Sequence, residues 1–136
     1  MTQVLLVGAD LALLEGLAQG LASQGHQPVV TGSLDEARDL ALAAPPLVLV
    51  VDRAMASQVG GALLSVPIAA GGARVLYRLA SVPPAPLLPA LQRAVLADLT
   101  LPLERYRLGA LVQSLADRVR ATGRGSRTTP PESRAT

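Results

Sequence analysis

The sequence predicts one α/β domain, in which a five-stranded parallel sheet carries helices on both faces. Two observations support this. Short, uninterrupted aliphatic runs recur along the chain, and amphipathic segments separate them. Continuous apolar runs are typical of strands buried on both faces, and strands that alternate with helices pair in parallel through right-handed crossovers. The chain has 136 residues, half of them hydrophobic, which is enough for one substantial core.

Five segments have the composition of strands. They are Val4–Val7, Gln27–Thr31, Leu47–Val51, Arg74–Leu79 and Asp98–Leu101. The fourth assignment is open, because Val66–Ala70 is also apolar, although Arg74–Leu79 has the better β composition. For strands and helices that alternate in this way, the compact arrangement is a flavodoxin-like, doubly wound sheet with strand order 2-1-3-4-5.

The first helix is expected over Leu11–Gln24, where leucines recur at helical spacing. Asp10 precedes it as a candidate N-cap, and Gly25 ends it. Gly16 and Gly20 lie about one turn apart, at a spacing found where two helices approach closely. We therefore expect the glycine face of this helix to pack tightly against a neighbouring element.

Capping signals and apolar spacing define the other helices. Ser33 and Glu36 form a capping box, in which the serine hydroxyl accepts from a backbone amide and the glutamate reaches back. That helix runs to about Ala44, and further helices are expected at residues 57–64, 87–97 and 103–121. The last helix has an apolar stripe that should be buried, formed by Leu108, Leu111, Val112, Leu115 and Val119.

Residues 1–121 are the expected domain, and residues 122–136 are an expected disordered tail because they contain no large apolar side chain. All twelve basic residues are arginines. Residues 1–102 contain five of them against seven acids, whereas residues 103–136 contain seven against three. The tail is therefore basic, and any contact with nucleic acid should be weak and confined to it.

Composition excludes several classes of site. The chain has no cysteine, which excludes disulfides and thiolate metal sites. His26 is the only histidine and is expected to be an exposed turn residue. The apolar stretch Leu40–Val51 is too short for a membrane span and contains two prolines, and the N-terminus resembles no signal peptide. We expect a soluble, cytoplasmic protein without a metal, a cofactor or catalytic residues.

Asp52 follows the third strand directly, at the carboxyl edge of the predicted sheet, where open parallel sheets bind their ligands. The segments Val4–Asp10, Pro46–Asp52 and Asp98–Leu103 resemble the receiver domain of bacterial response regulators, and the resemblance covers residues 3 to about 121. It implies that Asp52 stands at the phosphoacceptor position and Pro102 at the proline of the Lys-Pro step.

The other positions of the receiver site depart from the family pattern. Gly8 and Ala9 stand where receivers carry an acidic pair, and Leu101 where they carry the lysine. The hydroxyl position falls on Leu79 if Arg74–Leu79 is the fourth strand, and on Gly72 if Val66–Ala70 is. Phosphoryl transfer needs Mg²⁺ and fixed cations, and each lost charge-assisted contact is worth about 1.5–3 kcal/mol. The chain thus resembles a degenerate receiver, or pseudo-receiver, that is not an enzyme.

Two alternatives remain for this site. Asp10 and Asp52 could share Mg²⁺ in a functional phosphoacceptor site, or the altered pocket could bind a small molecule. As a phosphoacceptor, Asp52 is expected to be a relic. Its carboxylate should accept hydrogen bonds from loop amides or pair with Arg53 or Arg78.

The resemblance implies that a partner would bind the face made by the fourth helix, the fifth strand and the fifth helix. We expect this partner to be another signalling protein or a second copy of the chain, bound without control by phosphate. The candidate residues of this face are Arg93, Asp98, Tyr106, Gln113, Asp117 and Arg120. Tyrosine and arginine are residue types that protein interfaces favour.

Overall fold

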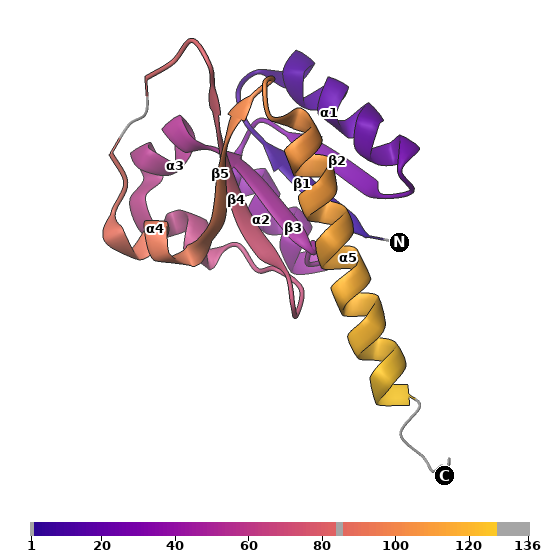
Figure 1. Ribbon diagram of the computed structural model, residues 1–136. Coiled ribbons are helices and arrows are strands. Elements are labelled where there is room, and N and C mark those ends of the chain that lie inside the picture. Colours follow the sequence, from indigo (N-terminus) through magenta and orange to yellow (C-terminus); the bar gives the residue numbers. More distant parts are fainter. Residues whose placement is uncertain (1, 84–85, 128–136) are drawn as a thin grey trace.

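The computed structural model describes residues 2–83 and 86–127, with the backbone alone at residues 57–62 and 122–127. Figure 1 shows one sheet between two layers of helices. The strands are β1 Gln3–Val7, β2 Gln27–Thr31, β3 Val48–Asp52, β4 Ala73–Leu79 and β5 Val95–Leu101. All neighbouring pairs are parallel and the order is β2-β1-β3-β4-β5. The predicted fold class and strand order are confirmed.

Helices connect the strands on both sides of the sheet. They are α1 Leu11–Ser23, α2 Leu34–Ala43, α3 Arg53–Val59, the 3₁₀ helix η1 Gly60–Ser65, α4 Pro89–Ala94 and α5 Arg105–Arg127. Helices α1 and α5 cover one face, and α2, α3 and α4 cover the other. Within the described residues, no helix is long and apolar enough to cross a membrane.

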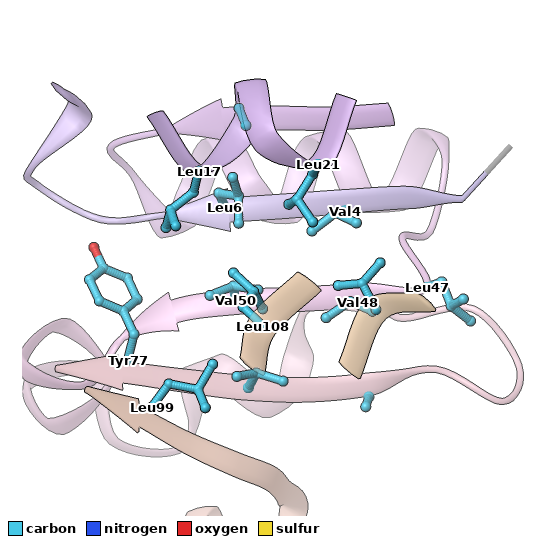
Figure 2. Packing of buried hydrophobic residues seen from close by; sticks show 14 of the residues in the cluster. Val4, Leu6, Leu17, Leu21, Leu47, Val48, Val50, Tyr77, Leu99 and Leu108 are labelled. Atoms are coloured by element: carbon cyan, nitrogen blue, oxygen red, sulfur yellow. The ribbon is translucent and has the colours of Figure 1, made fainter. Parts of the chain in front are cut away.

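The period-2 pattern of the central strands builds two cores. On β1 and β3, alternate residues pack under α1 and α5, as Figure 2 shows for Leu6 and Val50 beneath Leu17 and beside Leu108. The residues between them, such as Leu49, pack towards α2 and α3. Full burial of one such side chain contributes about 1.5–3 kcal/mol, so these aliphatic strands supply much of the stability.

The caps of α1 and α2 follow the sequence signals in part. The Ser33 side chain accepts a hydrogen bond from the Glu36 amide at 3.3 Å, as a capping box requires. The Glu36 carboxylate does not complete the box, because it accepts instead from the Thr31 hydroxyl. The expected close packing of Gly16 and Gly20 is wrong: a Cβ added at either would meet no atom within 4 Å, and α1 packs through its leucines.

The segment after β3 differs from the prediction. Helix α3 begins at Arg53, four residues before the expected start at Ser57, and η1 continues it. The reason is local: the Asp52 carboxylate accepts from the Ala54 amide at 2.9 Å, the bond that an N-cap residue makes with the first turn. The better of the two fourth-strand assignments is confirmed by β4, so Val66–Ala70 as a strand is wrong.

The boundary between α4 and β5 was also misplaced. Helix α4 ends at Ala94, and β5 begins at Val95 rather than at Asp98. The register of β4 against β5 shifts between Arg74 and Val75, which leaves Leu96 as an extra residue opposite that step. This β-bulge interrupts the alternation that would have revealed the strand in the sequence.

Helix α5 begins at Arg105 and continues to Arg127, six residues beyond the expected end at Ala121. Its buried residues hold the helix against the sheet, and a helix that has formed extends at little cost. The remainder of the expected tail, residues 128–136, lies outside the described residues. The predicted burial of Val119 is wrong, because this side chain is 37% exposed.

His26 is not the exposed turn residue that the sequence suggested. Only 7% of it is accessible, and its Nε2 is buried without a hydrogen-bond partner among the described residues. It lies after α1, where its backbone amide donates to Leu21, and lines a hollow with Gln113 and Arg120 of α5. The sequence could not show that α5, from the other end of the chain, packs beside this turn.

Candidate functional site

Asp52 is the last residue of β3 and lies at the carboxyl edge of the sheet, half-buried. Its Oδ1 accepts the hydrogen bond from the Ala54 amide, as expected for a carboxylate held by a loop amide. Nearby, Arg78 donates to the Val82 carbonyl at 3.0 Å and to the Thr100 hydroxyl at 3.3 Å. The carboxylate of Asp52 thus serves as the N-terminal cap of α3.

Asp10 has the same kind of role at the start of α1. It is exposed, and its Oδ1 accepts from the Leu13 amide at 3.1 Å. The predicted N-cap is therefore confirmed, and such a cap is worth about 1 kcal/mol. Within the part of the chain that the structure describes, no group of three or more acidic or histidine side chains could hold a metal ion.

Tyr77 fills the space beside these carboxylates. It lies on β4 directly opposite Asp52 in the register of the two strands, and none of its surface is exposed. Its ring reaches from β4 towards the end of β1, as Figure 2 shows. A Cβ added at Gly8 would overlap the Tyr77 Oη and lie 3.1 Å from its Cζ. The tyrosine therefore occupies the volume that any side chain at position 8 would need.

The Tyr77 hydroxyl is held neutral. Burial, together with the negative charges of Asp52 and Asp10, raises the pKa of this phenol well above its usual value. The hydroxyl has no hydrogen-bond partner among the described residues. A buried hydroxyl of this kind costs about 1–3 kcal/mol when it is left unpaired, so it is an unusual feature to find beside two carboxylates.

The remaining positions of the degenerate pocket are apolar or open to solvent. Leu101 is fully buried in the core, Leu79 is half-buried, and Ala9 and Pro102 are exposed. Leu79 and Asp52 line a cavity of about 70 Å³ together with residues of the loop that follows β4. This volume is far below the about 300–1,000 Å³ of typical ligand pockets.

The six residues of the predicted interaction face are distributed over α4, β5 and α5. Tyr106 is 77% exposed and lines a groove between α1 and α5. Gln113 and Arg120 line the hollow beside His26, and both contact Asp117 through hydrogen bonds. The other two residues lie elsewhere: Arg93 is at the end of α4, and Asp98 on β5 pairs with Arg53 at the start of α3.

Tyr77 was missed in the sequence, although two signals pointed to it. It is one of only two aromatic residues in the chain, and it lies within β4, the strand next to the one that ends in Asp52. A glycine at position 8 indicated that something approaches the chain closely there. Only the fold shows that the approaching group is this ring.

No protein-family model matches the sequence, and no curated protein does. Solved structures do match. HP1043, an orphan response regulator of H. pylori, has a TM-score of 0.58 at 16% identity, over 84% of this chain and 95% of its own. A response regulator from Desulfuromonas acetoxidans has a TM-score of 0.60 at 14% identity, over 86% and 98% of the two chains.

A response regulator receiver domain protein from Clostridium thermocellum has a TM-score of 0.61 at 10% identity, over 90% of this chain and 99% of its own. At such low identity the likeness establishes the fold and nothing finer. The sheet of this chain, with its order β2-β1-β3-β4-β5, has the architecture of response-regulator receiver domains.

Proposed function

We propose that the chain is a pseudo-receiver, a signalling module that acts by binding another protein and is not controlled by phosphorylation. The observation that carries the proposal is the fit of the Tyr77 ring against Gly8. In a receiver that binds Mg²⁺, carboxylates occupy this part of the site. Here a neutral, buried phenol fills it, and the nearest two carboxylates each cap a helix.

Electrostatics support the same conclusion. Mg²⁺ binds through one or two carboxylates and several waters in near-octahedral geometry, and it gives up its waters reluctantly. The cavity next to Asp52 has a volume of only about 70 Å³, which leaves little enclosed space for a hydrated ion beside a phosphoryl group. The position of the expected lysine is Leu101, which is fully buried, so it offers no cation to a phosphoryl oxygen.

Nothing in the geometry favours the two alternatives. In a site shared by Asp10 and Asp52, Oδ1 of each carboxylate already accepts a backbone amide at a helix start, which leaves Mg²⁺ mainly the two Oδ2 atoms and water. A small-molecule site in the altered pocket would need a far larger cavity, since ligand pockets are about 300–1,000 Å³. The proposal therefore assigns to this chain the remaining role, the binding of a protein through α4, β5 and α5.

The proposal is tested by recording amide chemical shifts of the protein during a titration with Mg²⁺, and again after addition of a small phosphodonor. We expect the amide chemical shifts of α4, β5 and α5 to remain unchanged in both experiments. Specific shifts at Asp52 and Ala54 that saturate at millimolar Mg²⁺ would indicate an intact metal site. Shifts that also spread to β5 on addition of the phosphodonor would contradict the proposal.

A further inference from the structure

A groove of about 480 Å³ lies between α1 and α5, the two helices that cover the same face of the sheet in Figure 1. We call it the α1–α5 groove. Most of its lining surface is apolar, and it includes Gly16 and Gly20 of α1. A Cβ added at either glycine would meet no atom within 4 Å. The groove is therefore open along α1, and a bulky side chain from outside the chain has room to pack there.

Tyr106 of α5 is a bulky side chain on the same groove. It lines the groove and is 77% exposed, although the whole chain has only two aromatic residues. The Arg105 guanidinium lies 4.9 Å from the centroid of the ring and donates to its hydroxyl at 3.1 Å, which orients the ring. Tyrosines are enriched among the few residues that supply most of the binding energy at protein interfaces.

The charges beside the groove are complementary between the two helices. Glu15 is the single charged residue of α1 and is exposed, and Arg105 is exposed at the start of α5. Neither side chain takes part in an ion pair within the described part of the chain. The same surface thus offers one negative and one positive group to a partner, an arrangement that complements itself.

We infer that the α1–α5 groove binds a second copy of the chain in a two-fold interface. Tyr106 of each copy packs into the groove of the other, and Arg105 of each copy faces Glu15 of the other. A two-fold interface uses one surface patch twice, so that patch must carry both the inserted side chain and the space that receives it. The α1–α5 groove carries both, and both charges as well.

A small molecule is a weaker candidate for this groove. The volume alone would suit one, but small-molecule sites bury most of the surface of their ligands. Here the one aromatic side chain of the groove is turned mostly to solvent instead of closing over it. The inference goes beyond the proposed function, because it adds α1 and a second copy of the chain, and it does not depend on whether Asp52 accepts a phosphoryl group.

The test is sedimentation velocity of the full chain over about a hundredfold range of protein concentration. We expect the average mass to rise with concentration from 14.0 kDa towards twice that value. Tyr106→Ala removes the inserted ring, and Gly20→Met fills the groove without a clash at Cβ. Each should raise the dissociation constant of the dimer at least about tenfold.

Two control variants place the same changes outside the groove. Leu42→Ala removes a side chain of α2 that is 65% exposed, and Ala22→Met enlarges an exposed position of α1 that does not line the groove. Each should change the dissociation constant by less than about twofold. Circular dichroism confirms that each variant is folded.

A mixing experiment tests the pairing of charges between copies. Glu15→Arg and Arg105→Glu should each weaken self-association at least about tenfold, because each sets like charges against each other across the two-fold axis. A mixture of the two variants restores opposite charges at both contacts. We expect the mixture to associate about as strongly as the unchanged protein, which a change within one chain would not produce.

Three outcomes would overturn the inference. A mass of 14.0 kDa at every concentration would show that a second copy is not the occupant. A dimer whose dissociation constant is the same in Tyr106→Ala and Gly20→Met, or one that the two control variants weaken equally, would place the interface outside the groove. A mixture of Glu15→Arg and Arg105→Glu that associates no better than either variant alone would refute the two-fold pairing.

Discussion

Replacing Gly8 by alanine tests whether the Tyr77 ring fills the degenerate site. The new Cβ would overlap the Tyr77 Oη and lie 3.1 Å from Cζ, and the ring is enclosed in the core. Overpacking of this kind costs about 1–3 kcal/mol. The φ angle of Gly8 is not in the left-handed region, so backbone strain does not contribute. Alanine has less conformational entropy than glycine in the unfolded chain, which offsets the loss of stability by about 0.4–1 kcal/mol. We expect a net loss of about 1–2 kcal/mol in the free energy of unfolding.

The Tyr77→Phe variant separates the clash from any other effect. It removes the atom that Gly8→Ala would strike first, and it removes a buried hydroxyl that lacks a partner among the described residues. Tyr77→Phe alone should leave the free energy of unfolding unchanged or raise it by about 1 kcal/mol. In the Phe background, Gly8→Ala should cost less by about 1 kcal/mol, a coupling expected only for groups in contact.

Urea unfolding followed by circular dichroism measures all four proteins of this cycle. Gly16→Ala is the matched control, because a Cβ added there meets no atom within 4 Å, and it should raise stability by about 0.5–1 kcal/mol through helix propensity. Additive effects of Gly8→Ala and Tyr77→Phe would refute the reasoning. A loss of more than about 1 kcal/mol in Tyr77→Phe alone would show that the hydroxyl is paired in solution.

Two further predictions follow from the same site. Because burial raises the folded-state pKa of Tyr77 above the unfolded value, its contribution to stability should be complete below about pH 10 and decline as the pH rises further, and Tyr77→Phe should abolish this decline in urea unfolding curves. The chain has no lysine or cysteine whose titration would add to the change in stability over that pH range. Asp10→Ala should lower the free energy of unfolding by about 1 kcal/mol through loss of the α1 cap, with the response to Mg²⁺ unchanged; a changed response would restore Asp10 as a metal ligand.

The layout of the sheet could be predicted because it depends on local patterns. Continuous aliphatic runs such as Val48–Val51 identify strands, and the alternation with helices leaves few possible strand orders. The end of α4 could not be predicted in the same way. The bulge at Leu96 breaks the alternation of β5, so a short helix followed by a strand has the same apolar pattern as one longer helix.

Sequence patterns predicted the residues of the candidate site only where the role of a residue depends on its neighbours in the chain. Asp52 and Asp10 could be placed because each follows a strand and precedes a helix. Tyr77 and Gly8 lie far apart in the sequence, and their complementary volumes become visible only when β1 and β4 are placed in the sheet. His26 was misjudged for a related reason, since the element that covers it, α5, belongs to the other end of the chain.

The most direct test of the pseudo-receiver proposal is the mass of the intact protein after incubation with a small phosphodonor and Mg²⁺, beside the Asp52→Asn variant. The Tyr77 ring fills the space at Gly8, and Leu101, at the position of the expected lysine, is buried and offers no cation to a phosphoryl oxygen. We therefore predict that neither protein increases by the mass of one phosphoryl group. A stoichiometric increase that disappears in Asp52→Asn would contradict the proposal.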